Sequence, residues 1–172
     1  MSDSRTRSEY IVAATALVVS LSTLGVYIYQ AKVMREQQHI SVWPCMEWNI
    51  TNAGEFHISA QNKGVGPAIV RKVELSLDGR PLKNNRELIT AVLGPDWTLG
   101  FFNSSLEGRV LIPGEMIMPF RIPDPSEAKA FDEKLRGHTL GLRITYCSVY
   151  GDCWVTDGDS TKRLPKVDLG FD

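Results

Sequence analysis

The stretch Tyr10–Tyr29, YIVAATALVVSLSTLGVYIY, runs for twenty residues without a charged side chain. As an α-helix it reaches about 30 Å, the thickness of the hydrocarbon core of a bilayer. Its serine and threonine hydroxyls can bond to the carbonyls of the preceding turn, so they do not need water. The sequence therefore predicts a transmembrane helix over residues 10–29, with the lipid bilayer as a first partner.

A cleaved signal peptide is the alternative for this segment. Arg5 and Arg7 would form its charged region. The apolar stretch, however, exceeds the usual length of about 7–15 residues, and no A-x-A-like cleavage site follows it. We therefore expect an uncleaved single-pass anchor, preceded by a disordered tail over residues 1–9.

The flanking charges bear on orientation. Arg5 and Arg7 precede the apolar segment, and Lys32 and Arg35 follow it. The positive-inside rule then leans slightly toward a cytoplasmic N-terminus. A domain beyond the span would accordingly face away from the cytoplasm, and a cytoplasm-facing domain is the alternative.

Composition narrows the function classes. The chain has 172 residues and a net charge of −1, so no basic surplus points to nucleic acid. After the span it is long enough for one compact domain and too short for two ordinary ones. We expect a helical stalk over residues 30–42, a single domain over 43–165 and a short tail over 166–172.

The stalk should end at Trp43-Pro44, because proline cannot continue a helix and biases the preceding residue toward extended geometry. Val33, Met34 and Ile40 share one helical stripe. That stripe would pack against the protein's own domain or pair with another helix.

Beyond Pro44 the pattern changes to short strands separated by turn residues. Alternation is clearest in Val73-Glu74-Leu75-Ser76-Leu77 and in residues 140–146, LGLRITY. The expected strands are Cys45–Asn49, Glu55–Gln61, Ile69–Leu77, Leu88–Leu93, Leu99–Phe102, Arg109–Ile112, Met116–Arg121, Thr139–Cys147 and Asp152–Asp157. This spacing predicts a mainly β domain, an antiparallel β-sandwich.

One short helix interrupts this pattern. Asp124 is a suitable N-cap, Pro125 suits the first helical position and Glu127 follows in the first turn. An apolar face then recurs at Ala128, Phe131 and Leu135, so we expect a helix that crosses between strands.

The turn Gly64-Val65-Gly66-Pro67 joins two of the expected strands. Both glycines would allow a positive φ where the chain turns sharply, and Pro67 would fix the exit. A phosphate-binding loop is not indicated, because β-rich sequence follows the glycines and GK[ST] is absent.

The wider run Gln61–Gly79 resembles the N-x-G-x-G-P-A…V-x-V-x-x-D-G signature of uncharacterised bacterial single-pass membrane proteins. Ile112–Glu115 (IPGE) and Tyr146–Trp154 (YCSVYGDCW) are similar to other marks of that group. The resemblance implies an immunoglobulin-like, adhesion-module-like β-sandwich behind one N-terminal membrane helix. It also implies a bacterial source, and it implies no activity. With the flanking charges and the cysteine spacing, we expect a protein of the bacterial inner membrane with its domain in the periplasm.

Cys147 and Cys153 enclose a predicted hairpin loop with Gly151 at its left-handed position. If the flanking strands pair, the two cysteines come close enough for a disulfide, which would favour an oxidising compartment. Two reduced cysteines in a cytoplasmic domain are the alternative. Cys45 then remains as a single thiol.

The richest apolar cluster outside the membrane segment is Trp97-Thr98-Leu99-Gly100-Phe101-Phe102. At strand period, Trp97, Leu99 and Phe101 share one face, which suits the core. If the segment is a loop, Trp97, Phe101 and Phe102 form the best candidate binding patch.

No catalytic, cofactor or metal pattern stands out. The histidines His39, His57 and His138 lie outside any recognisable nucleophile or ligand motif, and His57 is expected to face solvent. Residues 157–163 lack the spaced carboxylates of a calcium loop. We therefore expect a non-enzymatic module for protein interaction or self-association at the membrane surface. The alternatives are a small envelope hydrolase or thiol-redox protein, and a cytoplasm-facing subunit or regulator of a membrane complex.

Overall fold

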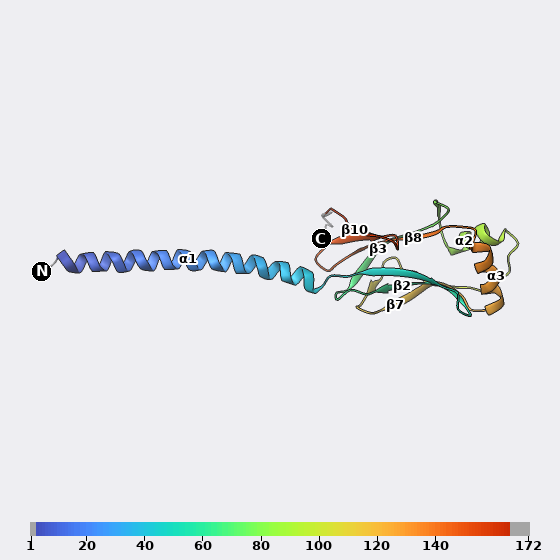
Figure 1. Cartoon of the computed structure of the whole chain (residues 1–172), viewed down its shortest axis with the longest axis horizontal. Helices are drawn as coiled ribbons and strands as arrows, with labels where there is room; N and C mark the ends of the chain where they lie inside the picture. Colours follow the sequence, from blue (N-terminus) through green and yellow to red (C-terminus); the bar gives the residue numbers. More distant parts are fainter. Residues whose placement is uncertain (1–2, 166–172) are drawn as a thin grey trace. The chain divides into compact units, whose positions relative to one another are not determined.

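The computed structural model describes residues 3–165 and divides the chain into two compact units, Met1–Ser41 and Val42–Asp172. The first unit is the single helix α1 (Asp3–Ser41), labelled in Figure 1. Within it the hydroxyls of Thr15, Ser20, Ser22 and Thr23 donate to carbonyls four residues earlier, at 2.7–2.8 Å. By length and composition α1 is suited to cross a membrane.

The bounds of α1 differ from the prediction at its start. The helix already includes residues 3–9, which the sequence predicted as a disordered tail. Polar residues other than glycine and proline tolerate a helix that the apolar segment has nucleated, so propagation into them costs little. The helix ends at Ser41, as expected just before Trp43-Pro44.

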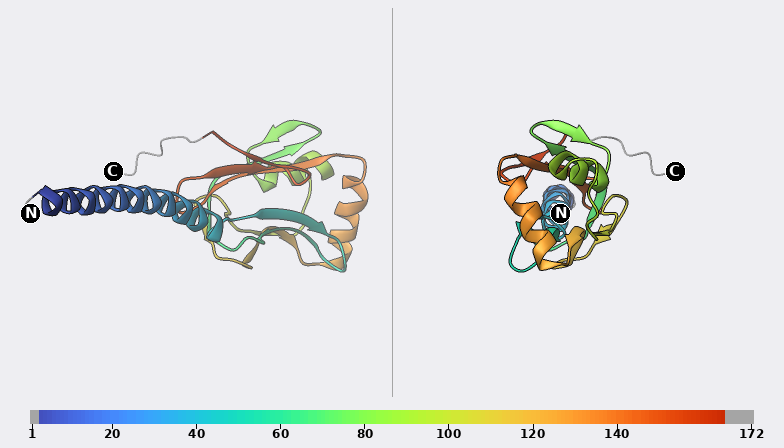
Figure 2. Two further views of the ribbon diagram at one scale, coloured as in Figure 1. Left: turned by 60° about the vertical axis from the view of Figure 1, so that its left-hand side comes forward. Right: turned by 90° about the vertical axis from the view of Figure 1, so that its right-hand side faces the viewer.

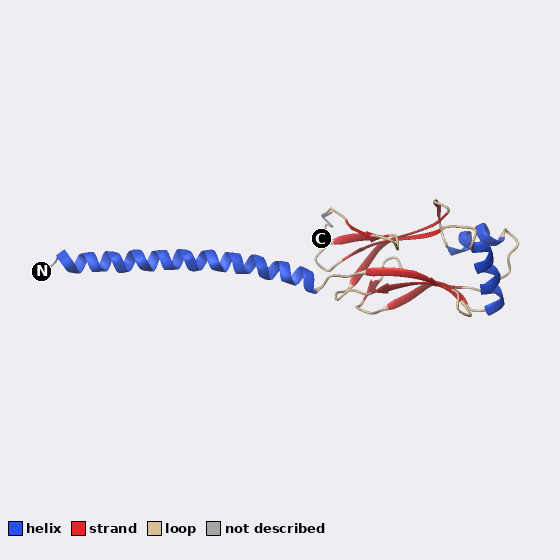
Figure 3. Cartoon of the chain, viewed as in Figure 1, coloured by secondary structure: helices blue, strands red, loops and turns tan. Residues whose placement is uncertain are grey.

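The second unit consists of two antiparallel sheets that face each other, with two short helices (Figure 3). The first sheet has the order β1-β2-β7-β5, with β1 (Met46–Thr51), β2 (Phe56–Asn62), β7 (Met116–Ile122) and β5 (Phe102–Asn103). The second has the order β10-β9-β8-β3-β4, with β10 (Thr161–Arg163), β9 (Cys153–Thr156), β8 (Leu140–Cys147), β3 (Ala68–Leu77) and β4 (Arg80–Leu82). β6 (Val110–Leu111) also pairs with β3. A β-rich domain is thus confirmed.

Alternation in the sequence explains which faces meet. In β8 the side chains of Leu142, Ile144 and Tyr146 are buried, while Arg143 between them is exposed. β3 pairs with β8 along most of its length, with a register shift between Val70 and Lys72. Apolar side chains from both sheets therefore fill one core.

An aromatic cluster lies at the centre of that core. Phe56, Phe120 and Phe131 are fully buried, and the Phe56 and Phe131 ring centroids lie 4.9 Å apart in an edge-to-face arrangement. Burying each ring contributes about 1.5–3 kcal/mol, with further gain from the aromatic geometry.

Phe131 belongs to α3 (Pro125–Leu135), the helix that the sequence predicted. The Asp124 side chain accepts hydrogen bonds from the backbone N–H groups of Ser126 and Glu127. Ala128, Phe131 and Leu135 form its buried face, and the helix crosses one end of the two sheets (Figure 2).

A second helix, α2 (Asn85–Leu93), lies where the sequence predicted a strand over Leu88–Leu93. That prediction is wrong, because Asn84 caps the helix by accepting from Glu87 N, and the Glu87 carboxylate accepts from Lys83 N. Such reciprocal capping fixes the first turn, and the apolar residues of the segment then form a single helical face. The domain thus has two helices in its described residues, and the sequence predicted one.

Candidate interaction surfaces

One buried side chain organises the end of the domain where the chain enters at Val42. Asn62, at the end of β2, is 0% exposed. Its Oδ1 accepts from Cys45 N (3.2 Å) and Gly64 N (3.0 Å), and its Nδ2 donates to Gly66 O (2.8 Å) and Leu111 O (3.0 Å). All four hydrogen-bonding positions of the amide are therefore used, which a buried amide requires. Asn62 joins the start of the domain to two loops.

The two glycines next to Asn62 do not have the role that the sequence predicted. Neither Gly64 nor Gly66 has a positive φ. A Cβ on Gly66 would instead lie 1.9 Å from Val42 O, and one on Gly64 would lie 2.4 Å from Trp43 O. The backbones approach too closely for any side chain, and Val65 N donates to Trp43 O at 3.0 Å. Glycine is required here for close approach.

Three loops meet at this end. Asn62 bonds to residues of the 63–67 and 112–115 loops, and the registers of β3 with β6 and β8 bring the 148–152 loop beside them. Large apolar side chains remain exposed here, with Val65 at 66% and Ile112 at 62%. We call this group the loop rim, and it comprises Trp43, Val65, Ile112, Met116, Val149 and Tyr150. Several exposed apolar side chains on neighbouring loops are typical of an interaction surface.

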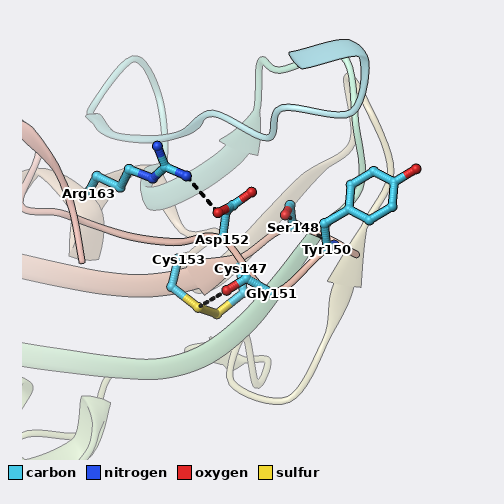
Figure 4. Close-up of a disulfide and its surroundings, with 7 residues drawn as sticks. All are labelled: Cys147, Ser148, Tyr150, Gly151, Asp152, Cys153 and Arg163. Atoms are coloured by element: carbon cyan, nitrogen blue, oxygen red, sulfur yellow. Dashed lines mark hydrogen bonds and ion pairs between the residues drawn. A yellow bond between two sulfur atoms is a disulfide. The ribbon is translucent and has the colours of Figure 1, made fainter. Parts of the chain in front are cut away.

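The hairpin that carries Val149 and Tyr150 is closed by a disulfide (Figure 4). Cys147 lies directly opposite Cys153 in the β8–β9 register, and their Cα atoms are 4.0 Å apart. Gly151 has a φ of 76°, the left-handed geometry that the sequence predicted. In Figure 4 the Tyr150 ring points away from the sulfur atoms.

A salt bridge supports the base of the same hairpin. The Asp152 side chain is 5% exposed, and its Oδ1 accepts from the Arg163 guanidinium at 2.6 Å. The backbone N–H of Ser148 donates to Asp152 O at 2.8 Å. The apolar tip is therefore held on a fixed base, which lowers the entropy that binding a partner would cost.

The aromatic segment at the other end of the domain divides between core and surface. The Trp97 and Phe101 rings pack against the core, 5.8 Å apart, and Trp97 Nε1 donates to Thr90 Oγ1. Phe102 is 63% exposed on the short edge strand β5. The predicted strand over Leu99–Phe102 is wrong, because the strand in this segment is β5, which covers only Phe102–Asn103. The predicted patch of Trp97, Phe101 and Phe102 is not brought together as one exposed surface.

β1 forms one edge of its sheet. β1 is the outer strand of its sheet, and Lys63 N donates to Cys45 O at 2.7 Å just before it. Hydrogen-bonded and non-hydrogen-bonded pairs alternate in an antiparallel ladder. Glu47 and Asn49 therefore direct their backbone groups toward β2, whereas Trp48 and Ile50 direct theirs away. Within residues 3–165 no strand pairs with that outer side.

A cavity of about 260 Å³ opens beside α2, between Leu82, Asn85, Asn103 and Glu107. Its polar groups are used within the fold, because Asn85 Nδ2 donates to Asn103 Oδ1 and Pro119 O. Glu107 likewise accepts from Val73 N.

Cys45 and His57 are not brought together. Cys45 lies just before β1, whereas His57 pairs with Thr51 at the other end of that strand, about 20 Å away at 3.3 Å per residue. Burial raises the pKa of the Cys45 thiol, and the neighbouring Glu47 raises it further.

His57 is only 12% exposed, so the expectation that it faces solvent is wrong. Its Nδ1 lies 3.0 Å from Glu55 Oε1, and His138 Nδ1 lies 2.6 Å from Asp78 Oδ2. Over the described residues, no three His, Cys, Asp or Glu side chains gather to hold a metal.

Sequence reasoning did not identify Asn62 or the loop rim. Asn62 gives no local signal, because its partners lie up to 49 residues away. A sequence pattern could have identified the loop rim, because large apolar residues occur next to turn glycines in three places. These are Val65-Gly66, Ile112-Pro113-Gly114 and Tyr150-Gly151.

No protein-family model, curated protein or solved structure matches this chain.

Proposed function

We propose that this chain is a single-pass protein of the bacterial inner membrane and a non-enzymatic interaction module at the membrane surface. In this proposal residues 10–29 span the bilayer, residues 30–41 form a stalk, and an immunoglobulin-like β-sandwich lies in the periplasm. The observation that carries the proposal is the loop rim, a group of exposed apolar side chains on three loops and on the adjoining residues Trp43 and Met116.

The paired cysteines support a periplasmic location, because disulfides persist in oxidising compartments and are rare in the cytoplasm. A cytoplasmic domain would contain reduced Cys147 and Cys153. The two orientations therefore differ in whether Cys147 and Cys153 form a disulfide or are two free thiols.

The experiment uses the full-length chain in bacterial cells. A photo-crosslinking amino acid at Val65 or Tyr150 should form adducts with another membrane-surface protein or a second copy. The same photo-crosslinking group at Lys129, which is exposed on α3, is the matched control. It should form at least fivefold less crosslinked adduct. Equal yields at the three positions would contradict the assignment of the rim.

Orientation is tested in parallel with a small charged maleimide on intact cells. In the Cys45→Ala variant we expect no labelled thiols before reduction and two after it. Two thiols that react only in permeabilised cells, without a reductant, would place the domain in the cytoplasm.

A further inference from the structure

Two segments of the domain match N-x-[ST], the motif of asparagine-linked glycosylation. They are Asn49-Ile50-Thr51 in β1 and Asn103-Ser104-Ser105, which begins at the end of β5. We infer that Asn49 is the acceptor of an asparagine-linked glycan and that Asn103 is not. This inference rests on the proposed periplasmic location of the domain, because the modification belongs to segments outside the cytoplasm.

The motif in β1 is open to a modifying enzyme. Asn49 is exposed and Thr51 is half-buried, and at strand period the two side chains share one face with Glu47. Within the described residues neither the Asn49 amide nor the Thr51 hydroxyl forms a hydrogen bond, and only the backbone carbonyl of Asn49 accepts one, from Ser59 Oγ at 3.4 Å. Both side-chain groups that define the motif are therefore available to a transferase.

The motif after β5 is held by the fold. Asn103 Oδ1 accepts from Asn85 Nδ2 at 2.8 Å, so the position of this amide is fixed against α2. The Ser105 hydroxyl donates to the backbone carbonyl of Glu107 at 3.2 Å. A transferase would have to break both hydrogen bonds before it could bind the asparagine and the hydroxyl together. Exposure alone does not distinguish the two motifs, because Asn103 and Ser105 are exposed as well.

The modification is a group transfer whose second substrate is an oligosaccharide linked to a polyprenyl diphosphate. Asn49 Nδ2 attacks C1 of the first sugar and loses one proton. A bond forms between Nδ2 and C1, the bond between C1 and the diphosphate oxygen breaks, and the polyprenyl diphosphate leaves. Nothing is oxidised or reduced. The product carries a bulky, hydrophilic group on the outer face of β1.

The experiment uses the full-length chain in membranes of bacterial cells that supply an oligosaccharyltransferase and a lipid-linked oligosaccharide. Mass spectrometry of tryptic peptides separates the two motifs, because Asn49 lies in residues 36–63 and Asn103 in residues 87–109. We expect the glycosylated fraction of the first peptide to be at least tenfold higher than that of the second. Equal fractions, or a higher fraction at Asn103, would overturn the inference.

Two variants of the same residue test whether the motif is what the enzyme reads. Thr51→Ala removes the hydroxyl and should lower the glycosylated fraction at Asn49 at least tenfold. Thr51→Ser is the matched control, because it also loses the γ-methyl group but keeps the hydroxyl, and it should change the fraction less than threefold. Unchanged glycosylation in Thr51→Ala would contradict recognition through this motif.

The maleimide experiment on Cys147 and Cys153 separates the failure of this inference from the failure of the proposed location. A secreted peptide with an N-x-[ST] motif, made in the same cells, shows that the transferase is active. No glycan on residues 36–63, in a domain whose two cysteines are labelled on intact cells only after reduction, would overturn the inference and leave the location intact. No glycan, together with two thiols that react only in permeabilised cells, would overturn both.

Discussion

The two ends of the β domain are closed in opposite ways. At one end, where α2 and α3 lie in Figure 1, the buried faces of both helices add apolar side chains to the core, and Trp97 packs against it. At the other end, the buried amide of Asn62 holds the loops together through hydrogen bonds. Large apolar side chains, among them Val65 and Ile112, remain exposed at this second end. Polar bonds can therefore hold an end of the domain together without burying the apolar residues beside it.

The largest effect should come from breaking the apolar end. Phe131→Ala removes a fully buried ring that contacts Phe56 and Phe120, and should lower the free energy of unfolding by about 4 kcal/mol. Urea unfolding of the full-length protein in detergent, followed by tryptophan fluorescence, measures this change. The matched control is Phe102→Ala, which truncates an exposed ring and should cost less than about 0.5 kcal/mol. Similar losses for both would refute the buried role of α3.

An intermediate effect is expected at the polar end. Asn62→Ala leaves two backbone N–H groups and two carbonyls without their partner, and should cost about 3 kcal/mol. The same unfolding experiment measures it. Asn52→Ala, which removes one exposed bond to Asp132, serves as the control and should cost under about 1 kcal/mol. If Asn62→Ala is as mild as its control, the loops are held by something other than this amide.

The smallest effect on stability should come from the loop rim itself. The double change Val65→Ser and Ile112→Ser alters two exposed side chains, and should shift the free energy of unfolding by less than about 0.5 kcal/mol. The same double variant should lower crosslinking from Tyr150 at least fivefold, because the apolar surface is lost. A large loss of stability would show that these side chains belong to the core.

Local signals explain what the sequence could predict. α3 was predictable because its cap, its proline and its apolar face all fall within Asp124–Leu135. α2 was missed because residues 88–93, LITAVL, are apolar and β-branched enough to be interpreted as a strand, while the deciding bond pairs Glu87 with Lys83. Turn chemistry predicted Gly151 correctly, since a left-handed residue in a short hairpin depends only on its neighbours.

Long-range contacts explain what the sequence could not predict. The roles of Gly64 and Gly66 depend on the backbone of Val42 and Trp43, more than twenty residues earlier. The Trp97 segment was interpreted by strand alternation, whereas tertiary packing against Phe120 decides which rings are covered. The position of β1 at the edge of its sheet could not be predicted, because the strand order within a sheet depends on the whole fold.

The position of β1 immediately after the junction has a mechanical consequence. A tensile load passed through the chain from α1 and directed along this strand would act in shear on its ladder with β2, so the pairs Glu47–Gln61, Asn49–Ser59 and Thr51–His57 would share the force. Hydrogen bonds loaded together must rupture together, whereas bonds loaded one after another unzip easily. The chain thus enters the domain through a strand whose ladder resists a pull along its own direction.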